Sequence, residues 1–188
     1  MVFSSLPFLF LFLTVVLLVS HILPFRFRNF FLLLANLVFY AYGEPVYVLI
    51  MIGSILVNFF AGLLMDKQST QGRRRAVLVV GIVLNLAALG VFKYAGLFVS
   101  TLREIPGLSS LPEVDIALPI GISFYTFQAV SYLIDVYWDD CAASHNLINF
   151  ASYISLFPQL IAGPIVRYKD VNEQLVSRRE TPTLFNSG

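Results

Sequence analysis

The chain has 188 residues, of which 58% are hydrophobic, 15% are aromatic and only 12% are charged. An average soluble domain is about 25% charged, so this chain has too little polar surface to cover a globular core and too much hydrophobicity to be disordered. The net charge of +1 excludes a strongly basic nucleic-acid surface, and the single cysteine, Cys141, excludes an internal disulfide and a cysteine-based zinc site. The composition indicates an all-α, polytopic integral membrane protein.

Uncharged runs predict the membrane-spanning helices. A helix needs about 20 apolar residues to cross a hydrocarbon core that is about 30 Å thick. The short run 29–43 reaches this length if Arg28 and Tyr42 extend to the two interfaces. No basic residue precedes Arg26, so the first run predicts a retained span and not a signal peptide. We expect about five spans, from the uncharged runs 1–25, 29–43, 45–65, 76–92 and 116–134, the last of which continues as a span to residue 138.

Lys and Arg alternate between the connecting loops. Loops 24–28 and 66–75 carry two and four positive residues, whereas loop 43–45 carries none. Because positive loops stay in the cytoplasm, this pattern places the N-terminus and loop 43–45 outside. Residues 93–115 then lie outside as well, where helical spacing of apolar residues followed by Pro106-Gly107 predicts an interfacial helix and an exposed loop.

The last apolar run contains Pro158, Gly163 and Pro164, so a straight helix is not expected there. If residues 146–166 crossed fully, the positive residues of the polar tail 167–188 would lie outside, against the charge rule. We therefore predict that 146–166 is a broken or re-entrant segment and that 167–188 is a cytoplasmic connector. Broken backbone at membrane depth needs surrounding protein or a water-filled cavity, so a cavity is expected nearby.

Few side chains suggest chemistry. His21 is expected to be an interfacial side chain, and His145 is expected to belong to a cap before Asn146. Asp135 is an acid within an apolar span, which makes it a functional candidate, although its closeness to Trp138 would also let it reach the interface. Other polar residues within the spans either bond across helices or line a cavity: Asn58, Asn85, Ser123, Tyr125, Thr126, Gln128, Ser131 and Tyr132. Five glycines are expected to mark close helix packing: Gly53, Gly62, Gly81, Gly90 and Gly96.

Three longer stretches carry a family resemblance: LPIGISFYTFQ at 118–128, YLIDVY at 132–137 and FPQLIAGPIVRY at 157–168. The opening MVFSS, FYAYGEP at 39–45 and FKY at 92–94 add to it. Together they resemble the membrane-bound O-acyltransferase (MBOAT) family, most of all its bacterial alginate O-acetyltransferase branch. The likeness runs along nearly the whole chain in order.

The resemblance implies a ring of helices around a thin central tunnel and transfer of an acyl group to a hydroxyl. It implies a multi-pass protein of the bacterial inner membrane, in contact with membrane lipid. Acetyl would come from a cytoplasmic donor, acetyl-CoA, and reach an exported polysaccharide acceptor such as alginate. Periplasmic polysaccharide-modification proteins would be partners. No bound cofactor, metal or nucleic acid is expected.

One departure from the family pattern limits this expectation. The family's catalytic histidine stands beside Trp in a later apolar segment, and neither His21 nor His145 matches that motif. Family members are also more than twice this length, so the resemblance places the catalytic histidine beyond Gly188. It therefore implies that residues 1–188 form the N-terminal part of an MBOAT-like domain that is inactive alone. The candidates for tunnel-lining or support are Gln128, Asp135, Gln159 and Arg167.

Two other functions stay open at this stage. Within the enzyme class, the alternative is D-alanyl transfer to teichoic acid, the activity of a related MBOAT branch. Outside it, the alternative is a non-enzymatic transporter or scaffold subunit, because broken segments and polar residues within spans also occur in transporters.

Overall fold

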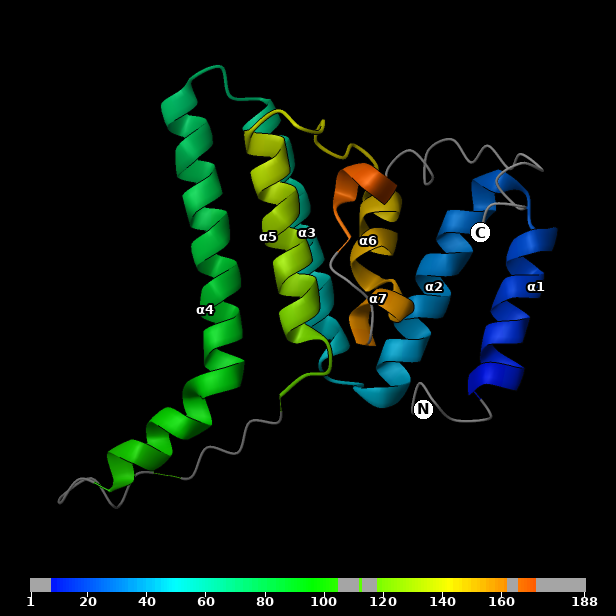
Figure 1. The fold of residues 1–188 in the computed structure, drawn as a ribbon, viewed down its shortest axis with the longest axis horizontal. Helices are drawn as coiled ribbons and strands as arrows, with labels where there is room; N and C mark the ends of the chain where they lie inside the picture. The colour runs from blue at the N-terminus through cyan, green and yellow to red at the C-terminus, as the bar shows by residue number, and fades with distance from the viewer. Residues whose placement is uncertain (1–7, 105–111, 113–117, 162–165, 172–188) are drawn as a thin grey trace.

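The computed structural model describes residues 8–104, 112, 118–161 and 166–171, and every regular element among them is a helix. The all-helical class is confirmed for this part of the chain. The helices stand side by side, with α1 at one edge and α4 at the other (Figure 1). In chain order they are η1 (Phe8–Leu13), α1 (Thr14–Ile22), α2 (Phe25–Gly43), α3 (Val48–Asp66), α4 (Gln71–Arg103), α5 (Ile122–Tyr137), α6 (Leu147–Ser155) and α7 (Phe157–Ile161).

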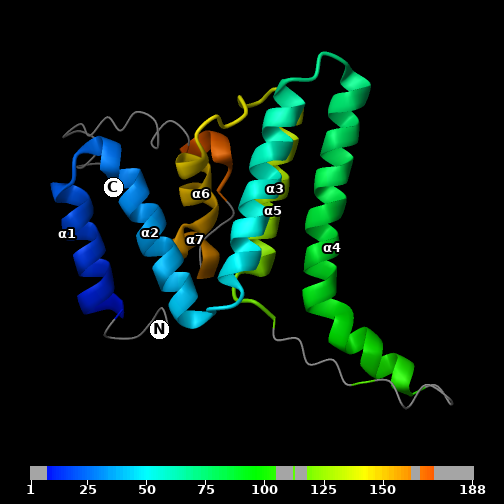
Figure 2. The same ribbon diagram turned by 180° about the vertical axis from the view of Figure 1, so that it is seen from behind.

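Two of these helices, α3 and α4, are long and apolar enough to cross a membrane. Their surfaces are largely unburied within the described residues, and α4 has neighbours only on the side of α3 and α5 (Figure 2). A helix whose exposed face is this apolar suits a hydrocarbon surrounding and not water. The count of about five spans stays a prediction.

The turn between α1 and α2 is shorter than the predicted loop 24–28. Leu23 adopts an extended backbone because the ring of Pro24 disfavours the helical conformation of the residue before it. The next helix begins directly at Phe25, so residues 25–28 are helical and the loop prediction is wrong there. Its 19 residues give α2 a length of about 28 Å, which is close to the thickness of a bilayer core.

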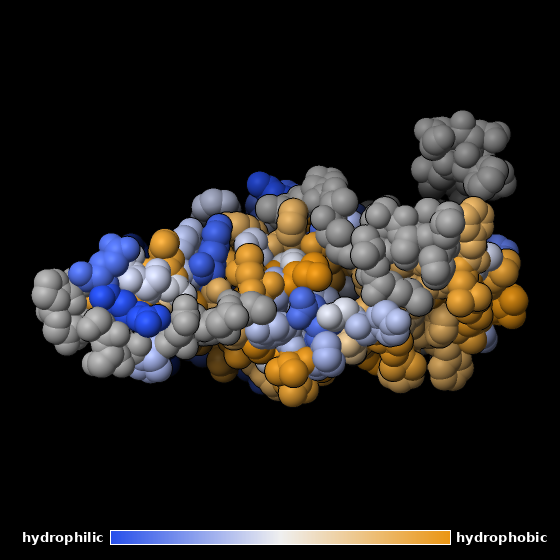
Figure 3. Space-filling model, turned by 90° about the horizontal axis from the view of Figure 1, so that it is seen from below, coloured by the Kyte–Doolittle hydropathy of each residue, from blue (hydrophilic) through white to orange (hydrophobic). Residues whose placement is uncertain are grey.

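Helix α4 is much longer than the predicted span 76–92. It includes residues 71–75, which were predicted as loop, and continues through residues 93–103, which were predicted as a separate helix. Its end bends away from the bundle and projects past it (Figures 1 and 2). Hydrophilic side chains gather on this projecting end, whereas hydrophobic ones cover the flank around α1 and α2 (Figure 3). An interfacial position for 93–103 stays a prediction, and most of 104–117 lies outside the described residues.

Two glycines allow helices to approach closely, as predicted. The Tyr132 side chain of α5 lies directly against Gly62 of α3, where it occupies the place of a missing Cβ. At Gly81 of α4, an added Cβ would lie only 2.6 Å from Leu133 Cδ1. The same prediction for Gly96 stays untested. It is wrong for two glycines that face open space: Gly53 and Gly90.

The structure describes a break after α6 that comes earlier in the chain than Gly163 and Pro164, and the broken or re-entrant segment 146–166 stays a prediction. Helix α6 ends at Ser155 and α7 begins at Phe157. Pro158 has no N–H, and its ring would clash with the carbonyl of Ile154 in a continuous helix, so α6 cannot run through it.

The end of the chain lies outside the described residues. These residues cover 166–171 of the predicted connector 167–188, whereas 162–165 and 172–188 are not among them. Gly188 belongs to the range 172–188. The resemblance places the catalytic histidine beyond this residue. The cytoplasmic connector and the position of the histidine beyond Gly188 therefore stay predictions.

The chain on both sides of the α6–α7 segment is attached to one tyrosine. The backbone N–H of Ser144, just before α6, donates to the Tyr132 hydroxyl at 3.1 Å. After α7, the Tyr168 ring packs edge-on against Tyr132, with their centroids 5.1 Å apart. The hydroxyl of Tyr153 also donates to the carbonyl of Val166 at 2.8 Å. Residues 144 and 168 therefore lie at the same end of the bundle, beside the start of α6 (Figure 1).

Candidate functional site

A hydrogen bond joins two of the four side chains that the sequence predicted as tunnel-lining or support residues. The Gln128 amide nitrogen, on α5, donates to the Gln159 amide oxygen, on α7, at 2.7 Å. Gln128 is buried to 1% exposure, and its own amide oxygen has no partner among the described residues. An unpaired buried amide oxygen costs about 1–3 kcal/mol, so this one is suited to accept a hydrogen bond from water or a ligand.

Other buried polar atoms also lack a hydrogen-bond partner within the described residues. Asn36 of α2 and Ser155 of α6 are fully buried, and Tyr125 of α5 is 1% exposed. Neither amide atom of Asn36 has a hydrogen-bond partner within the described residues, nor do the hydroxyls of Tyr125 and Ser155. Buried polar groups in native proteins are nearly always paired. Unpaired groups from three neighbouring helices therefore indicate an interior that water, a ligand or further protein completes.

The interface between α2 and α6 is polar along its length. Asn29 donates from its amide to the Asn149 amide oxygen at 2.9 Å, and the Ser152 hydroxyl donates to the Asn29 carbonyl at 3.1 Å. Both helices run in the same direction (Figure 1). Asn36 lies two turns beyond Asn29, and Ser155 lies one turn beyond Ser152, on the same faces. The unpaired side chains of Asn36 and Ser155 therefore continue this polar interface into the bundle.

Asp135 is buried to 2% exposure, so neighbouring helices cover its side chain. Both interpretations of this acid stay predictions. Its Oδ2 atom has no hydrogen-bond partner among the described residues. The positive charges that act on this carboxylate are those of Arg167 and Lys169, which stand on either side of the anchored Tyr168. Arg167 itself is exposed, and no hydrogen bond joins it to the Gln128 side chain in the described structure. The roles of all four candidates stay predictions.

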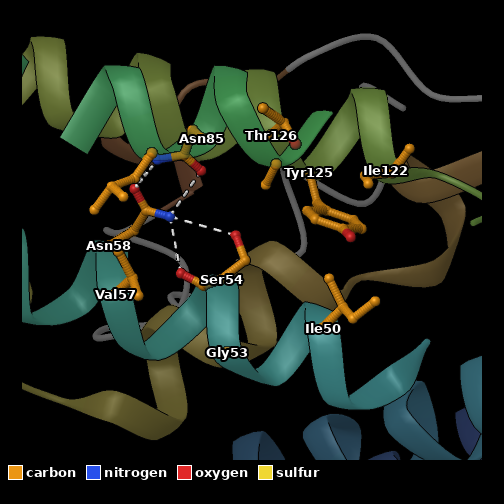
Figure 4. Close-up of a pocket in the computed structure, with 11 residues that line it drawn as sticks. Ile50, Gly53, Ser54, Val57, Asn58, Asn85, Ile122, Tyr125 and Thr126 are labelled. Atoms are coloured by element: carbon orange, nitrogen blue, oxygen red, sulfur yellow. Dashed lines mark hydrogen bonds between the residues drawn. The ribbon is translucent and has the colours of Figure 1, made fainter. Parts of the chain in front are cut away.

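Asn58 of α3 and Asn85 of α4 do both things that were predicted for polar residues within spans: they bond across helices, and they line a cavity. Each amide donates to the other's oxygen, at 3.0 and 2.7 Å, and each also donates to its own helix backbone, at Ser54 and Gly81. The pair also forms part of the wall of a cavity of about 340 Å³ (Figure 4). The cavity is otherwise lined mainly by apolar atoms, from Ile50, Gly53, Val57, Leu84, Ala88, Ile122, Tyr125 and Thr126.

Charged side chains gather at the end of the bundle where α4 begins. The Arg74 guanidinium makes a bidentate ion pair with Asp139, at 2.6 and 3.0 Å, and donates to the Val136 carbonyl at 2.9 Å. These hydrogen bonds hold the pKa of Asp139 below its usual value. The pair joins the start of α4 to the chain just after α5.

Both histidines lie outside the polar interior. His145 is exposed, and its Nε2 stands 3.5 Å from the Asp66 carboxylate. The cap before α6 is made by Asn146, whose side-chain oxygen accepts from the next turn, while His145 takes no part. His21 is exposed at the end of α1, where its carbonyl accepts from Arg28 at 3.5 Å. Neither histidine is placed to act on a group held beside Gln128.

Sequence reasoning missed Asn36 and Ser155. Their polarity is visible in the sequence, but their lack of a partner appears only when the neighbouring helices are in place. A signal was present for one of them, because Asn29 and Asn36 are seven residues apart and therefore share one helix face. Ser155 offered no comparable signal, since serines are common where membrane helices pack.

Comparison with known proteins gives relatives along the full chain. The chain is 44% identical over 192 aligned residues to the probable alginate O-acetylase AlgI of Pseudomonas aeruginosa and 41% identical over 193 to that of Azotobacter vinelandii. Both alignments cover the whole chain but only 37% and 38% of the relatives. A peptidoglycan O-acetyltransferase of Helicobacter pylori is 31% identical over 81% of the chain and 35% of the relative.

No family model matches the chain, and no solved structure matches it. The resemblance to alginate O-acetylases that the sequence motifs predicted is confirmed by these relatives. The chain spans less than two fifths of the length of the alginate O-acetylases described above.

Proposed function

We infer that this chain is part of a membrane-bound O-acyltransferase of the MBOAT family, and we propose that the natural protein O-acetylates an exported polysaccharide. One observation carries the proposal: 44% identity along the whole chain to a protein named as an alginate O-acetylase. The buried, unpaired polar groups of Asn36, Tyr125, Gln128 and Ser155 support it, because acyl transfer to a hydroxyl needs a polar path inside an apolar bundle.

The proposed setting is the bacterial inner membrane, with several spans in an MBOAT-like ring and the N-terminus outside. The Arg74–Asp139 ion pair supports this topology, because it joins two chain positions that the positive-inside rule places together in the cytoplasm. The attachment of Ser144 and Tyr168 to Tyr132 supports a re-entrant 146–166 segment, since both of its ends lie at one end of the bundle.

In this proposal the chain's own residues form one wall of the path. Acetyl enters from cytoplasmic acetyl-CoA. The unpaired amide N–H and hydroxyl groups donate hydrogen bonds to the acetyl carbonyl, and the unpaired oxygens accept a hydrogen bond from the acceptor hydroxyl. Preorganised hydrogen bonds act strongly there because the surrounding helices exclude bulk water. Asp135, Gln159 and Arg167 support this wall: Gln159 holds Gln128, and Arg167 offers a positive charge near Asp135.

The general base for the acceptor hydroxyl would come from a segment beyond Gly188, as the family resemblance implies. His21 and His145 are both exposed at helix ends, so neither can take a proton from a group inside the bundle. The chain alone is therefore expected to be inactive. Periplasmic polysaccharide-modification proteins would receive the acetyl group or the modified polymer, which the same resemblance implies.

A second acceptor is favoured by one observation. The Helicobacter pylori relative is named a peptidoglycan O-acetyltransferase, so the cell-wall glycan is the alternative to an exported polysaccharide such as alginate. Identity to the alginate O-acetylases is higher and extends over more of the chain, which places the exported polysaccharide first.

Deletion of the gene tests both acceptors. Ester-linked acetate would be released by mild alkali from the purified exported polysaccharide and, separately, from purified peptidoglycan. We expect acetate to disappear from the exported polysaccharide, to stay unchanged in peptidoglycan and to return when the wild-type gene is restored. Loss from peptidoglycan alone would support the second acceptor, and unchanged acetate in both polymers would refute O-acetylation.

A further inference from the structure

The short helix α7 closes one end of the polar interior. It lies between α2 and α5, next to the end of α6, in both views of the bundle (Figures 1 and 2). On one side the Phe157 ring meets the Phe39 ring of α2, with their centroids 5.5 Å apart. On the other side Gln159 accepts the hydrogen bond from Gln128 of α5. Helix α7 therefore bridges two helices that carry unpaired buried groups.

The unpaired polar atoms near α7 are enclosed by this chain itself. The Gln128 amide oxygen, the Ser155 hydroxyl and both amide atoms of Asn36 have almost no exposed surface and no hydrogen-bond partner in the part of the chain that the structure describes. Neither water nor a substrate reaches them in this conformation, and protein beyond this chain cannot reach them without displacing residues of the chain. Because buried polar groups are nearly always paired, we expect these atoms to find their partners when the interior opens.

A backbone break separates α7 from α6. Helix α7 has five residues, and Leu156 before it has a ψ of 107°, outside the helical range. The N–H groups of Gln159 and Leu160 both donate to the Leu156 carbonyl, at 3.0 and 3.1 Å. The side chains of Asn149 and Ser152 meanwhile bond α6 to α2. Rotation at Leu156 would therefore swing α7 as a unit while α6 stays in place, as in a hinge that absorbs its movement at one residue.

The contact between α7 and α5 depends on Gly121. This residue has a φ of 77°, in the left-handed region that glycine adopts without strain. An added Cβ would stand 2.7 Å from Leu160 Cδ2 and 3.1 Å from the Leu160 carbonyl oxygen, so the missing side chain lets α7 seat against the start of α5. On its other side, Phe157 and Leu160 of α7 and Phe39 of α2 line part of a pocket of about 40 Å³. Packing between α7 and α2 is therefore incomplete, which leaves α7 room to move.

Helix α7 lies at the end of the bundle that the charge rule places outside. At this end α2 stops and α5 begins, and the Tyr40 hydroxyl of α2 donates to the Ile120 carbonyl at 2.9 Å. Loop 43–45, which follows α2, is expected outside because it carries no positive residue. A polymer that approaches from outside would therefore meet α7 before it meets Gln128.

We propose that α7 is a lid over the acceptor side of the path. It moves aside at Leu156 to admit a sugar hydroxyl, and its return restores the bond that orients Gln128. Lids that close over a bound substrate exclude water and complete the set of groups around it. The inference rests on the proposed function for the identity of the acceptor, whereas the movement of α7 is measurable without acetylation.

Reactivity of an enclosed thiol tests the movement in the natural protein. Ser155→Cys places a thiol near α7, in a background from which the natural cysteines, Cys141 among them, are removed. Ala129→Cys is the matched control, because Ala129 is 1% exposed and packs in the hydrophobic core. A small water-soluble methanethiosulfonate, added to the membranes, should modify Ser155→Cys about tenfold faster than Ala129→Cys, since local opening exposes only the first. Equally slow modification of both thiols would overturn the lid.

A disulfide between α7 and α5 tests whether α7 is the part that moves. Leu160 Cβ stands 3.5 Å from the place of a Cβ on Gly121, a separation that suits a disulfide. In the same cysteine-free background, oxidation of the double variant Gly121→Cys/Leu160→Cys should lower acetylation of the polymer in membrane vesicles about tenfold, and reduction should restore it. Each single variant is a control that should not respond to the oxidant.

The outcomes separate the lid from the proposed function. No acetylation by the wild-type protein would refute acetyl transfer, and the thiol comparison would then decide whether α7 opens. Full activity of the oxidised double variant beside an active wild type would overturn the lid alone. If the strain of a cysteine at Gly121 keeps the double variant from accumulating, the comparison of Ser155→Cys with Ala129→Cys decides the question by itself.

Discussion

Gln128 and Gln159 are joined by a 2.7 Å hydrogen bond, although they stand 31 positions apart in the sequence. The bond connects the long helix α5 to the short helix α7, which follows the break at Leu156. A side chain on a five-residue helix has little local structure to hold it, so this bond orients Gln159 toward the interior of the bundle. The interior amide oxygen of Gln128 is then left available for a ligand.

Replacement of Gln159 tests whether this pair matters to the reaction. We expect Gln159→Ala in the natural protein to lower polysaccharide acetylation about tenfold, equivalent to ~1.4 kcal/mol, because the Gln128 amide loses its orientation. The amount of protein in the membrane should not fall. Gln71→Ala is the matched control, since Gln71 is exposed and makes only a 3.4 Å bond to Tyr137. Unchanged acetylation in Gln159→Ala would contradict a role for the pair.

The amide pair of Asn58 and Asn85 predicts strong coupling between two substitutions. Asn58→Leu alone should lower the free energy of unfolding by about 1 kcal/mol, because it leaves the Asn85 amide without its partner. The double variant with leucine at both positions should be nearly as stable as the wild type. A double-mutant cycle of unfolding in detergent or bicelles measures this coupling. Strictly additive losses would show that the two amides act independently.

The Arg74–Asp139 ion pair predicts a loss of stability in acid. Because the pKa of Asp139 is lowered in the folded protein, the stabilisation is present at neutral pH and is lost as the pH falls below about 4, through the folded pKa. The melting temperature of Asp139→Asn should therefore lie below that of the wild type at pH 7, and the difference between the two should shrink as the pH falls below about 4. Asparagine also tolerates the positive φ of 60° at this position.

Asp140→Asn is the control for the acid prediction. It removes the same charge from the next residue, which is exposed and has no ion pair within the described part of the chain. Its melting temperature should follow that of the wild type at neutral and at acid pH. Coincident curves for the wild type and Asp139→Asn from neutral to acid pH would rule out a contribution from the ion pair.

Labelling from each side of the membrane tests the re-entrant segment. Single cysteines at Asp140 and Asp170, both exposed, should react with an impermeant maleimide from the cytoplasmic side only. A cysteine at Val46, in the turn after α2, should react from the outside only. Burial raises the pKa of the natural Cys141 to about 11, so this thiol stays largely protonated at neutral pH and reacts slowly. Reaction of Asp170→Cys from the outside would mean that 146–166 crosses completely.

The sequence predicted the helices better than it predicted their ends. Hydropathy located every helix that contains a long apolar run, because an apolar run of this length has no other stable structure in a membrane. The start of α2 was missed because arginines in a first helical turn look like a loop when only charge is counted. The start of α4 was missed for the same reason, because Arg73, Arg74 and Arg75 lie in its first turns.

The candidate site was only partly visible from the sequence. The resemblance singled out Gln128 and Gln159, but no local pattern shows that they bond to each other. Asp135 was open to an interfacial interpretation because Trp138 stands three positions after it, and only the packing of other helices around α5 shows that its side chain is buried. Asn36 and Ser155 depend entirely on tertiary packing, which brings two parallel helices together in register.

Transfer of labelled acetyl tests the central claim most directly. Inside-out membrane vesicles that contain the natural protein and its polysaccharide machinery would be given acetyl-CoA labelled in the acetyl group, and alkali-labile label would be counted in the recovered polymer. We predict label in the polymer with the wild-type protein and about one tenth as much with Gln159→Ala, the tenfold loss expected above. Equal labelling in vesicles that lack the protein would contradict its assignment as an O-acetyltransferase.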